Sequence, residues 1–170
     1  MKRVLIIGCG GAGKSTLARR LATVSGLPVV HLDRHYWNDG WVPTSDAAWQ
    51  EVVRELMQGP YWIMDGNYGG TMSARIAEAD TIVFLDFPRW LCLWRIIRRR
   101  VRFAGQSRPD LPPGCPERLT WEFLAYIWNY RRTRRPVVLD RLKVLAGQKR
   151  VIVLRNPREV AAFEQSMGFE

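Results

Sequence analysis

One stretch near the N-terminus, Gly8-Cys9-Gly10-Gly11-Ala12-Gly13-Lys14-Ser15, constrains the fold more than any other feature of the chain. It matches the pattern G-x-x-x-x-G-K-[ST] in full, follows the apolar run VLII at residues 4–7 and opens a helical pattern over residues 14–24. Glycines let successive backbone N–H groups turn inward around phosphates, and the N-terminus of the helix adds partial positive charge. The motif therefore predicts a phosphate-binding loop between a buried strand and a helix.

Short apolar runs alternate with helical patterns along the rest of the chain. Strands are expected at residues 4–7, 29–33, 61–65, 81–86 and 150–154, with helices between them, including a long basic helix over about 88–103. Such alternation predicts an α/β fold of three layers, in which helices cover both faces of a parallel sheet. No repeat or long linker interrupts residues 1–170, so we expect a single domain.

The carboxyl ends of the expected strands carry the polar residues. In parallel sheets ligands bind at these ends. The sequence therefore predicts a site there, formed around Gly8, Asp33, Asp65, Asp86 and Arg155.

The net charge of +10 is concentrated in one part of the chain. Residues 89–158 carry 18 Lys and Arg against 4 Asp and Glu, whereas residues 1–88 carry 8 against 9. This distribution favours a polyanionic partner. We expect no signal peptide and no membrane partner, since no apolar run approaches the length of a span. The three cysteines are widely spaced and match no metal-ligand pattern, which favours a reducing, cytoplasmic setting.

The donor side of the expected site follows from the phosphate loop. Lys14 would contact the β- and γ-phosphates of a nucleoside triphosphate, and the Ser15 hydroxyl would ligate Mg²⁺. Asp65 ends an apolar run and suits a metal position, although it could instead cap the turn DGNYGG. The chain has no N-K-x-D motif of a GTPase, which leaves a small ATP-dependent kinase as our leading hypothesis. We assign to the bound nucleotide Gly8, Gly10, Gly11, Ala12, Gly13, Lys14, Ser15, Thr16 and Arg155.

The acceptor would enter beside Asp33. If the acceptor is a hydroxyl, this carboxylate could orient it and take its proton, whereas an acceptor phosphate needs no base. The aromatic residues that follow could stack a ring or simply close the pocket. Arg75 could hold an anionic group of the acceptor or lie on the surface. The expected substrate-binding residues are Arg34, Tyr36, Trp37, Trp41, Asn67, Tyr68 and Arg75.

Arginines supply the remaining expected catalytic groups. Arg95 and Arg99 are four residues apart in one helix and share a face, as a pair that clamps the transferring phosphoryl group should. The Pro- and Gly-rich segment after this helix, which carries Arg108, has the composition of a lid, inserted over about residues 99–121. The run YRRTRR at 130–135 carries four arginines that cannot all face one site.

Several longer motifs resemble those of adenylate-kinase-related P-loop kinases labelled DNA topology modulation proteins. They are LDRHYWNDGW, MDGNYGGT, ADTIVFLDFPR, RPDLPPGCPE and IWNYRRTRRP, and the resemblance covers about residues 1–158. It implies a P-loop NTPase core with strand order 2-3-1-4-5, Mg-ATP as donor, Lys14 and Ser15 on the phosphates and metal, Asp65 as the "DG" carboxylate, and Arg95 and Arg99 as clamps. DGNYGG replaces the adenylate kinase DGFPR, and the lid lacks a four-cysteine zinc site, which puts phosphorylation of nucleoside monophosphates in doubt.

The alternative hypothesis is a nucleotide-regulated protein that binds DNA through the basic segment 89–158 and affects DNA topology. No reading-head motif is present, so such binding would be directed at the phosphate backbone. Neither the acceptor nor the oligomeric state follows from the sequence.

Overall fold

The computed structural model describes residues 1–168, and its core is a five-stranded parallel sheet. The sheet order is β2-β5-β1-β6-β7, which is 2-3-1-4-5 when only these five strands are counted. The predicted α/β fold and strand order are thus confirmed. The strands are β1 (Arg3–Gly8), β2 (Val29–His31), β5 (Trp62–Asp65), β6 (Thr81–Leu85) and β7 (Arg150–Leu154).

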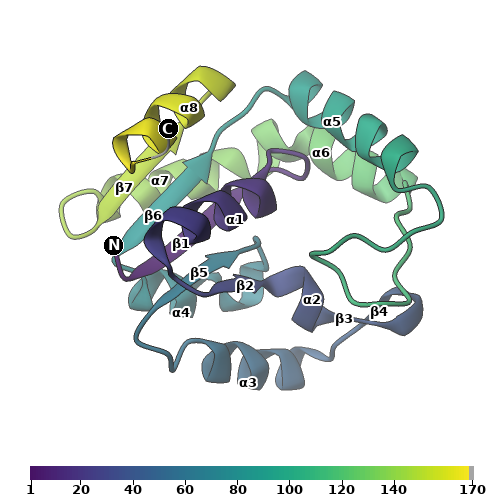
Figure 1. Ribbon diagram of the computed structural model, residues 1–170, viewed down its shortest axis with the longest axis horizontal. Helices are drawn as coiled ribbons and strands as arrows, with labels where there is room; N and C mark the ends of the chain where they lie inside the picture. The colour runs from purple at the N-terminus through teal and green to yellow at the C-terminus, as the bar shows by residue number, and fades with distance from the viewer. Residues whose placement is uncertain (169–170) are drawn as a thin grey trace.

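Helices cover both faces of this sheet, with α1 in front of it and α7 behind it in Figure 1. The central strands are therefore apolar on both faces, and Val4, Leu5 and Ile6 of β1 are all fully buried. None of the helices in the described part of the chain is long and apolar enough to cross a membrane. The helices are α1 (Lys14–Ser25), α2 (Leu32–Tyr36), α3 (Asp46–Leu56), α4 (Gly69–Glu78), α5 (Arg89–Arg102), α6 (Trp121–Thr133), α7 (Arg135–Leu145) and α8 (Pro157–Ser166).

The second predicted strand is too long, because β2 ends at His31 and α2 begins at Leu32. Leu32 is fully buried and packs where a side chain on Gly66 would stand. Because Leu32 is apolar, it extended the strand-like pattern in the sequence, although in the fold it belongs to α2. Asp33 consequently lies in the first turn of α2 rather than at a strand end.

A small hairpin after α2 was not anticipated from the sequence. It pairs β3 (Trp37–Asn38) with β4 (Val42–Pro43) across a 3₁₀ turn. Residues 103–120 contain no helix or extended strand, as their prolines predicted, and they pack against this hairpin. The Gly40 amide donates to the Gly114 carbonyl (3.1 Å), and the Trp41 indole donates to the Pro116 carbonyl (3.0 Å). The loop thus lies across the carboxyl ends of the strands (Figure 1).

Candidate active site

The loop from Gly8 to Ser15 connects β1 to α1 and requires glycine for two separate reasons. Gly8, Gly11 and Gly13 have φ values of 150°, 78° and 98°, which side-chain-bearing residues rarely adopt. A Cβ on Gly10 would stand 2.8 Å from the ring of Phe123, and one on Gly11 would collide with the Cys92 carbonyl. The N-terminus of the 12-residue helix α1 has no side-chain cap. Its free N–H groups face the loop, as anion binding requires.

Lys14 and Asn67 both bond to the start of this loop. The Lys14 ammonium donates to the carbonyls of Gly8 and Cys9, at 3.1 Å each. Asn67 accepts from the Gly8 amide (3.1 Å) and donates to the Gly8 carbonyl (2.8 Å) and to the Tyr126 hydroxyl (2.9 Å). These bonds engage both ends of the Asn67 amide, so its expected role as an acceptor ligand is corrected. Asn67 instead fixes the first peptide of the phosphate loop.

Ser15 and Asp65 meet at the mouth of the loop. The Ser15 hydroxyl donates to Asp65 Oδ2 (2.7 Å), and Asp65 Oδ1 contacts His31 Nδ1 (2.6 Å). The Asp65 side chain is only 5% exposed, so its carboxylate is held in one orientation by these two neighbours. A hydroxyl and a carboxylate side by side fit Mg²⁺, which takes few ligands from the protein and the remainder from phosphates and water. No cluster of three or more His, Cys, Asp or Glu side chains among residues 1–168 offers a larger metal cage.

Asp33 forms the polar centre of the acceptor side. The Tyr68 hydroxyl donates to Asp33 Oδ1 at 2.6 Å. Burial raises the pKa of Asp33, while the Tyr68 bond and the positive charge of Lys14 partly oppose that rise. Burial, together with the Asp33 charge, also raises the pKa of Tyr68. A carboxylate whose pKa is shifted upward in this way suits proton transfer.

Aromatic rings surround this carboxylate. Tyr36 packs against Tyr68 at a centroid distance of 4.6 Å and against Trp37 at 4.9 Å. Trp37 in turn packs edge-on to Trp41 at 5.3 Å. The structure thus brings together all four of the expected aromatic residues, and Arg34 is exposed beside them.

Arg75 does not occupy the acceptor site, which corrects the prediction for this residue. Its side chain is fully buried, and its guanidinium donates to the carbonyls of Gly66, Asn67 and Tyr68 and to the Thr71 hydroxyl (3.2 Å). Burial lowers the pKa of Arg75 to about 10. Arg75 therefore stabilises the loop between β5 and α4 through hydrogen bonds to its backbone.

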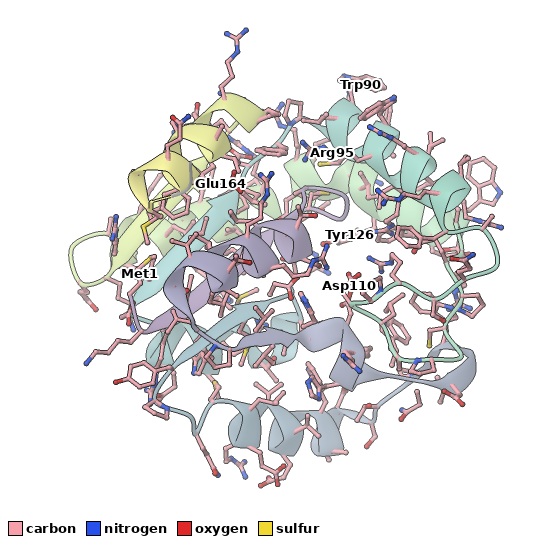
Figure 2. All side chains as sticks on the ribbon, in the orientation of Figure 1. Met1, Trp90, Arg95, Asp110, Tyr126 and Glu164 are labelled. Carbon is pink, nitrogen blue, oxygen red and sulfur yellow. The ribbon has the colours of Figure 1, made fainter. Side chains whose placement is uncertain are left out.

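The two expected clamp arginines both lie near the phosphate loop but have different partners. Arg95 Nη1 donates to the Ala12 carbonyl (2.9 Å), which places its guanidinium against the loop itself. Arg99 instead pairs with Glu117, with 2.8 Å between Nη2 and Oε1. In the view of Figure 2, Arg95, Tyr126 and Asp110 lie around the N-terminal end of α1.

The remaining expected nucleotide ligands lie on the surface. Thr16 is exposed in the first turn of α1. Arg155 is exposed directly after β7, and its backbone amide donates to Glu159 Oε2 (2.7 Å). Its expected contact with the nucleotide stays a prediction.

The arginine run at 130–135 serves two different purposes. Arg135 forms a bidentate pair with Asp86, with both N–O distances 2.7 Å, and so ties α7 to the end of β6. Arg131, Arg132 and Arg134 are exposed. Asp86 thus holds a neighbouring helix, and three of the four arginines of the run face solvent.

Comparisons with known proteins agree with this architecture. A shikimate kinase from Acinetobacter baumannii, solved in complex with shikimate, superposes with a TM-score of 0.62 over 98% of this chain and 90% of its own, at 17% identity. The fold is that of the P-loop kinases. The shikimate kinase of Paramagnetospirillum magneticum (strain ATCC 700264 / AMB-1) is 29% identical over 133 residues, which cover 69% of this chain and 65% of that protein.

An uncharacterised Bacillus subtilis (strain 168) protein, YqaC, is 28% identical over 110 residues, or 62% of this chain and 61% of its own length. The chain thus spans less than two thirds of the curated relatives it matches. No family model matches the chain.

Sequence reasoning missed three residues that the structure places in the site. His31, at the end of β2, contacts Asp65. Tyr126 bonds to Asn67, and Glu117 pairs with Arg99. His31 stands two residues before Asp33, near the end of an expected strand, and consecutive strands end at one edge of the sheet. This position could have indicated that His31 lies in the site. Tyr126 and Glu117 lie in segments that gave no comparable signal.

Proposed function

We propose that the chain is an ATP- and Mg²⁺-dependent kinase that phosphorylates a hydroxyl group of a small molecule. The observation that carries this proposal is the Ser15–Asp65 hydrogen bond at the mouth of a glycine loop in its phosphate-binding form. The P-loop kinase fold and the partial similarity to shikimate kinase support it. Membership in the adenylate-kinase-related group labelled DNA topology modulation proteins is likewise a proposal, supported by the sequence motifs.

On the donor side, the loop amides and Lys14 bind the β- and γ-phosphates. Lys14 Nζ exchanges its bonds to Gly8 and Cys9 for phosphate oxygens, which are stronger acceptors because they are charged. Ser15 and Asp65 would hold Mg²⁺, which when bound neutralises charge on the β- and γ-phosphate oxygens. Arg95, bonded to the loop at Ala12, supplies a further positive charge beside them.

On the acceptor side, Asp33 accepts the proton of the attacking hydroxyl. The acceptor oxygen forms a bond to the γ-phosphorus as the bond from that phosphorus to the β–γ bridging oxygen breaks, and ADP leaves. A hydroxyl acceptor is favoured over a phosphate because Arg75, the expected ligand for an anionic group of the acceptor, is committed to the loop carbonyls. The rings of Tyr36, Trp37 and Tyr68 provide an apolar wall for the acceptor.

The test is Mg-ATP consumption by the pure protein against a panel of nucleosides, nucleoside monophosphates and small hydroxy-metabolites. We expect one hydroxyl acceptor to raise turnover well above the basal rate, and Lys14→Ala and Asp33→Asn to remove that increase. The matched control is Lys143→Ala, since the Lys143 side chain is 77% exposed and lies outside the site. Full activity of folded Lys14→Ala would refute the mechanism.

A second candidate, single-stranded nucleic acid binding, is favoured by the surface of α5 and α6. Trp90 and Trp128 are 61% and 41% exposed, and the Arg89 guanidinium lies 4.1 Å from the Trp128 ring centroid. Exposed rings beside arginines are what base stacking and backbone contact require. With the three exposed arginines of the run as contacts, log K should fall with log[salt] at a slope of about −2. Absence of oligonucleotide binding at low salt would remove this candidate.

A further inference from the structure

Four charged side chains form one buried cluster between α5 and the loop 103–120. Glu117 Oε1 accepts from Arg99 Nε at 2.9 Å and lies 2.8 Å from Arg99 Nη2. Glu117 Oε2 lies 2.7 Å from Arg108 Nε, and Arg108 Nη1 donates to Asp110 Oδ2 at 2.8 Å. The Glu117 side chain is 1% exposed and that of Arg108 is 10% exposed. One buried carboxylate therefore holds two guanidinium groups.

The arrangement leaves part of each guanidinium available for a further ligand. Glu117 engages Arg99 only through Nε and Nη2, so Arg99 Nη1 has no bond within the cluster. On Arg108, Nη1 donates to Asp110, and Nε forms an ion pair with Glu117 Oε2 without hydrogen-bond geometry, so Nη2 has no bond within the cluster. Two arginines this close repel each other, and their separation is set by the carboxylate between them.

The cluster is linked to the phosphate loop through α5. Arg99 is in α5, four residues from Arg95, whose guanidinium bonds to the phosphate loop at Ala12. Burial alone would raise the pKa of Asp110, but the positive charge of Arg108 holds it below its usual value. Arg108 also lies near enough to Asp33 to oppose the upward shift of that pKa. Asp110 lies near the N-terminal end of α1 in Figure 2, so its partner Arg108 is close to where a transferring phosphoryl group would lie.

We propose that Glu117 is a positioning residue, which fixes Arg99 and Arg108 in one orientation so that both reach the transferring γ-phosphoryl group. This role rests on the proposed kinase function, and it adds the requirement that residue 117 carries a carboxylate. Glu117 itself does not contact the nucleotide. Its carboxylate spans a sequence separation of 18 residues to Arg99 and thereby joins the loop to α5. A single side chain therefore determines both the position of the loop 103–120 against α5 and the orientation of the two arginines.

The experiment compares the affinities of the folded protein for ATP and for ADP by calorimetry, because the ratio isolates contacts to the γ-phosphate. The variants are Glu117→Gln, which keeps the size and removes the charge, and Glu117→Asp, which keeps the charge. The control is Asp140→Asn, which removes an exposed carboxylate paired with Lys143. Wild-type protein that binds neither nucleotide would refute the proposed function, and this outcome is separate from any result on Glu117.

We expect Glu117→Gln to reduce the preference for ATP over ADP by about tenfold, the equivalent of one lost charged hydrogen bond, with little change in ADP affinity. Glu117→Asp should fall between Glu117→Gln and wild type, and Asp140→Asn should match wild type. An unchanged preference in folded Glu117→Gln, or an equal loss of affinity for both nucleotides, would overturn the proposal. If Glu117→Gln fails to fold, Glu117→Asp decides by the same ratio, since an unchanged preference there overturns the proposal as well.

Discussion

Replacing Arg75 with methionine distinguishes its structural role from a role in binding the acceptor. The guanidinium donates to three carbonyls of the loop that follows β5, and the side chain is fully buried. Methionine fills much of the space but donates no hydrogen bond, so these carbonyls lose their partner. Each orphaned acceptor costs about 1–3 kcal/mol, and relaxation of the loop recovers part of the sum. We therefore expect the free energy of unfolding to fall by about 3–5 kcal/mol, a large share of the ~5–15 kcal/mol typical of a domain.

The measurement is urea denaturation followed by fluorescence of the eight tryptophans. The matched control is Arg54→Met, which removes a 63% exposed guanidinium paired with Glu51 and should change stability by no more than about 0.5 kcal/mol. A loss below about 1 kcal/mol in Arg75→Met, accompanied by a raised KM for the acceptor, would refute the structural role and restore the sequence-based prediction.

Three further predictions concern the site and its supports. Tyr68→Phe removes a bond that lowers the pKa of Asp33, so the acidic limb of the kcat/KM profile should move to higher pH, and an unmoved limb would exclude Asp33 as the base. Arg135→Leu leaves the buried Asp86 carboxylate without its bidentate partner and should destabilise the fold by about 3–5 kcal/mol in chemical denaturation, whereas a change below 1 kcal/mol would contradict the importance of this pair. Gly11→Ala should abolish ATP binding in calorimetry, because its φ of 78° and the nearby carbonyl of α5 leave no room for a methyl group, and wild-type affinity would show that the loop can rearrange.

The phosphate loop could be predicted because its requirements are local in the sequence. Gly8, Gly11 and Gly13 supply the backbone conformation, and Lys14 and Ser15 follow within the same turn of chain. The parallel sheet covered on both faces was predictable from the alternation of apolar strands and helices, whereas the strand order was implied by the resemblance to adenylate-kinase-related proteins. Each of these inferences depends on residue types and spacings that the sequence displays directly.

The role of Arg75 could not be predicted, because its partners are backbone carbonyls, which every residue carries. Nothing in the sequence distinguishes the carbonyls of the loop after β5 from any others. The side chain of Asn67 is misleading for the same reason, since it bonds to the backbone of Gly8. Polar residues near a site thus have one of two roles, because they either face the ligand or hold the loop. Only the fold shows which role a given residue has.

The arginines show how the fold changes the meaning of the charge pattern. By composition, residues 89–158 form one basic segment that suits a polyanion. In the structure Arg99 and Arg108 are paired with Glu117, and Arg135 is paired with Asp86. Each of these three charges is paired with a carboxylate, so together they contribute less to the field that an external nucleic acid would meet than three free arginines would. The unpaired positive charge at the surface is therefore smaller than the count of arginines indicates, and the paired share lies in the cluster around Glu117 and at the end of β6.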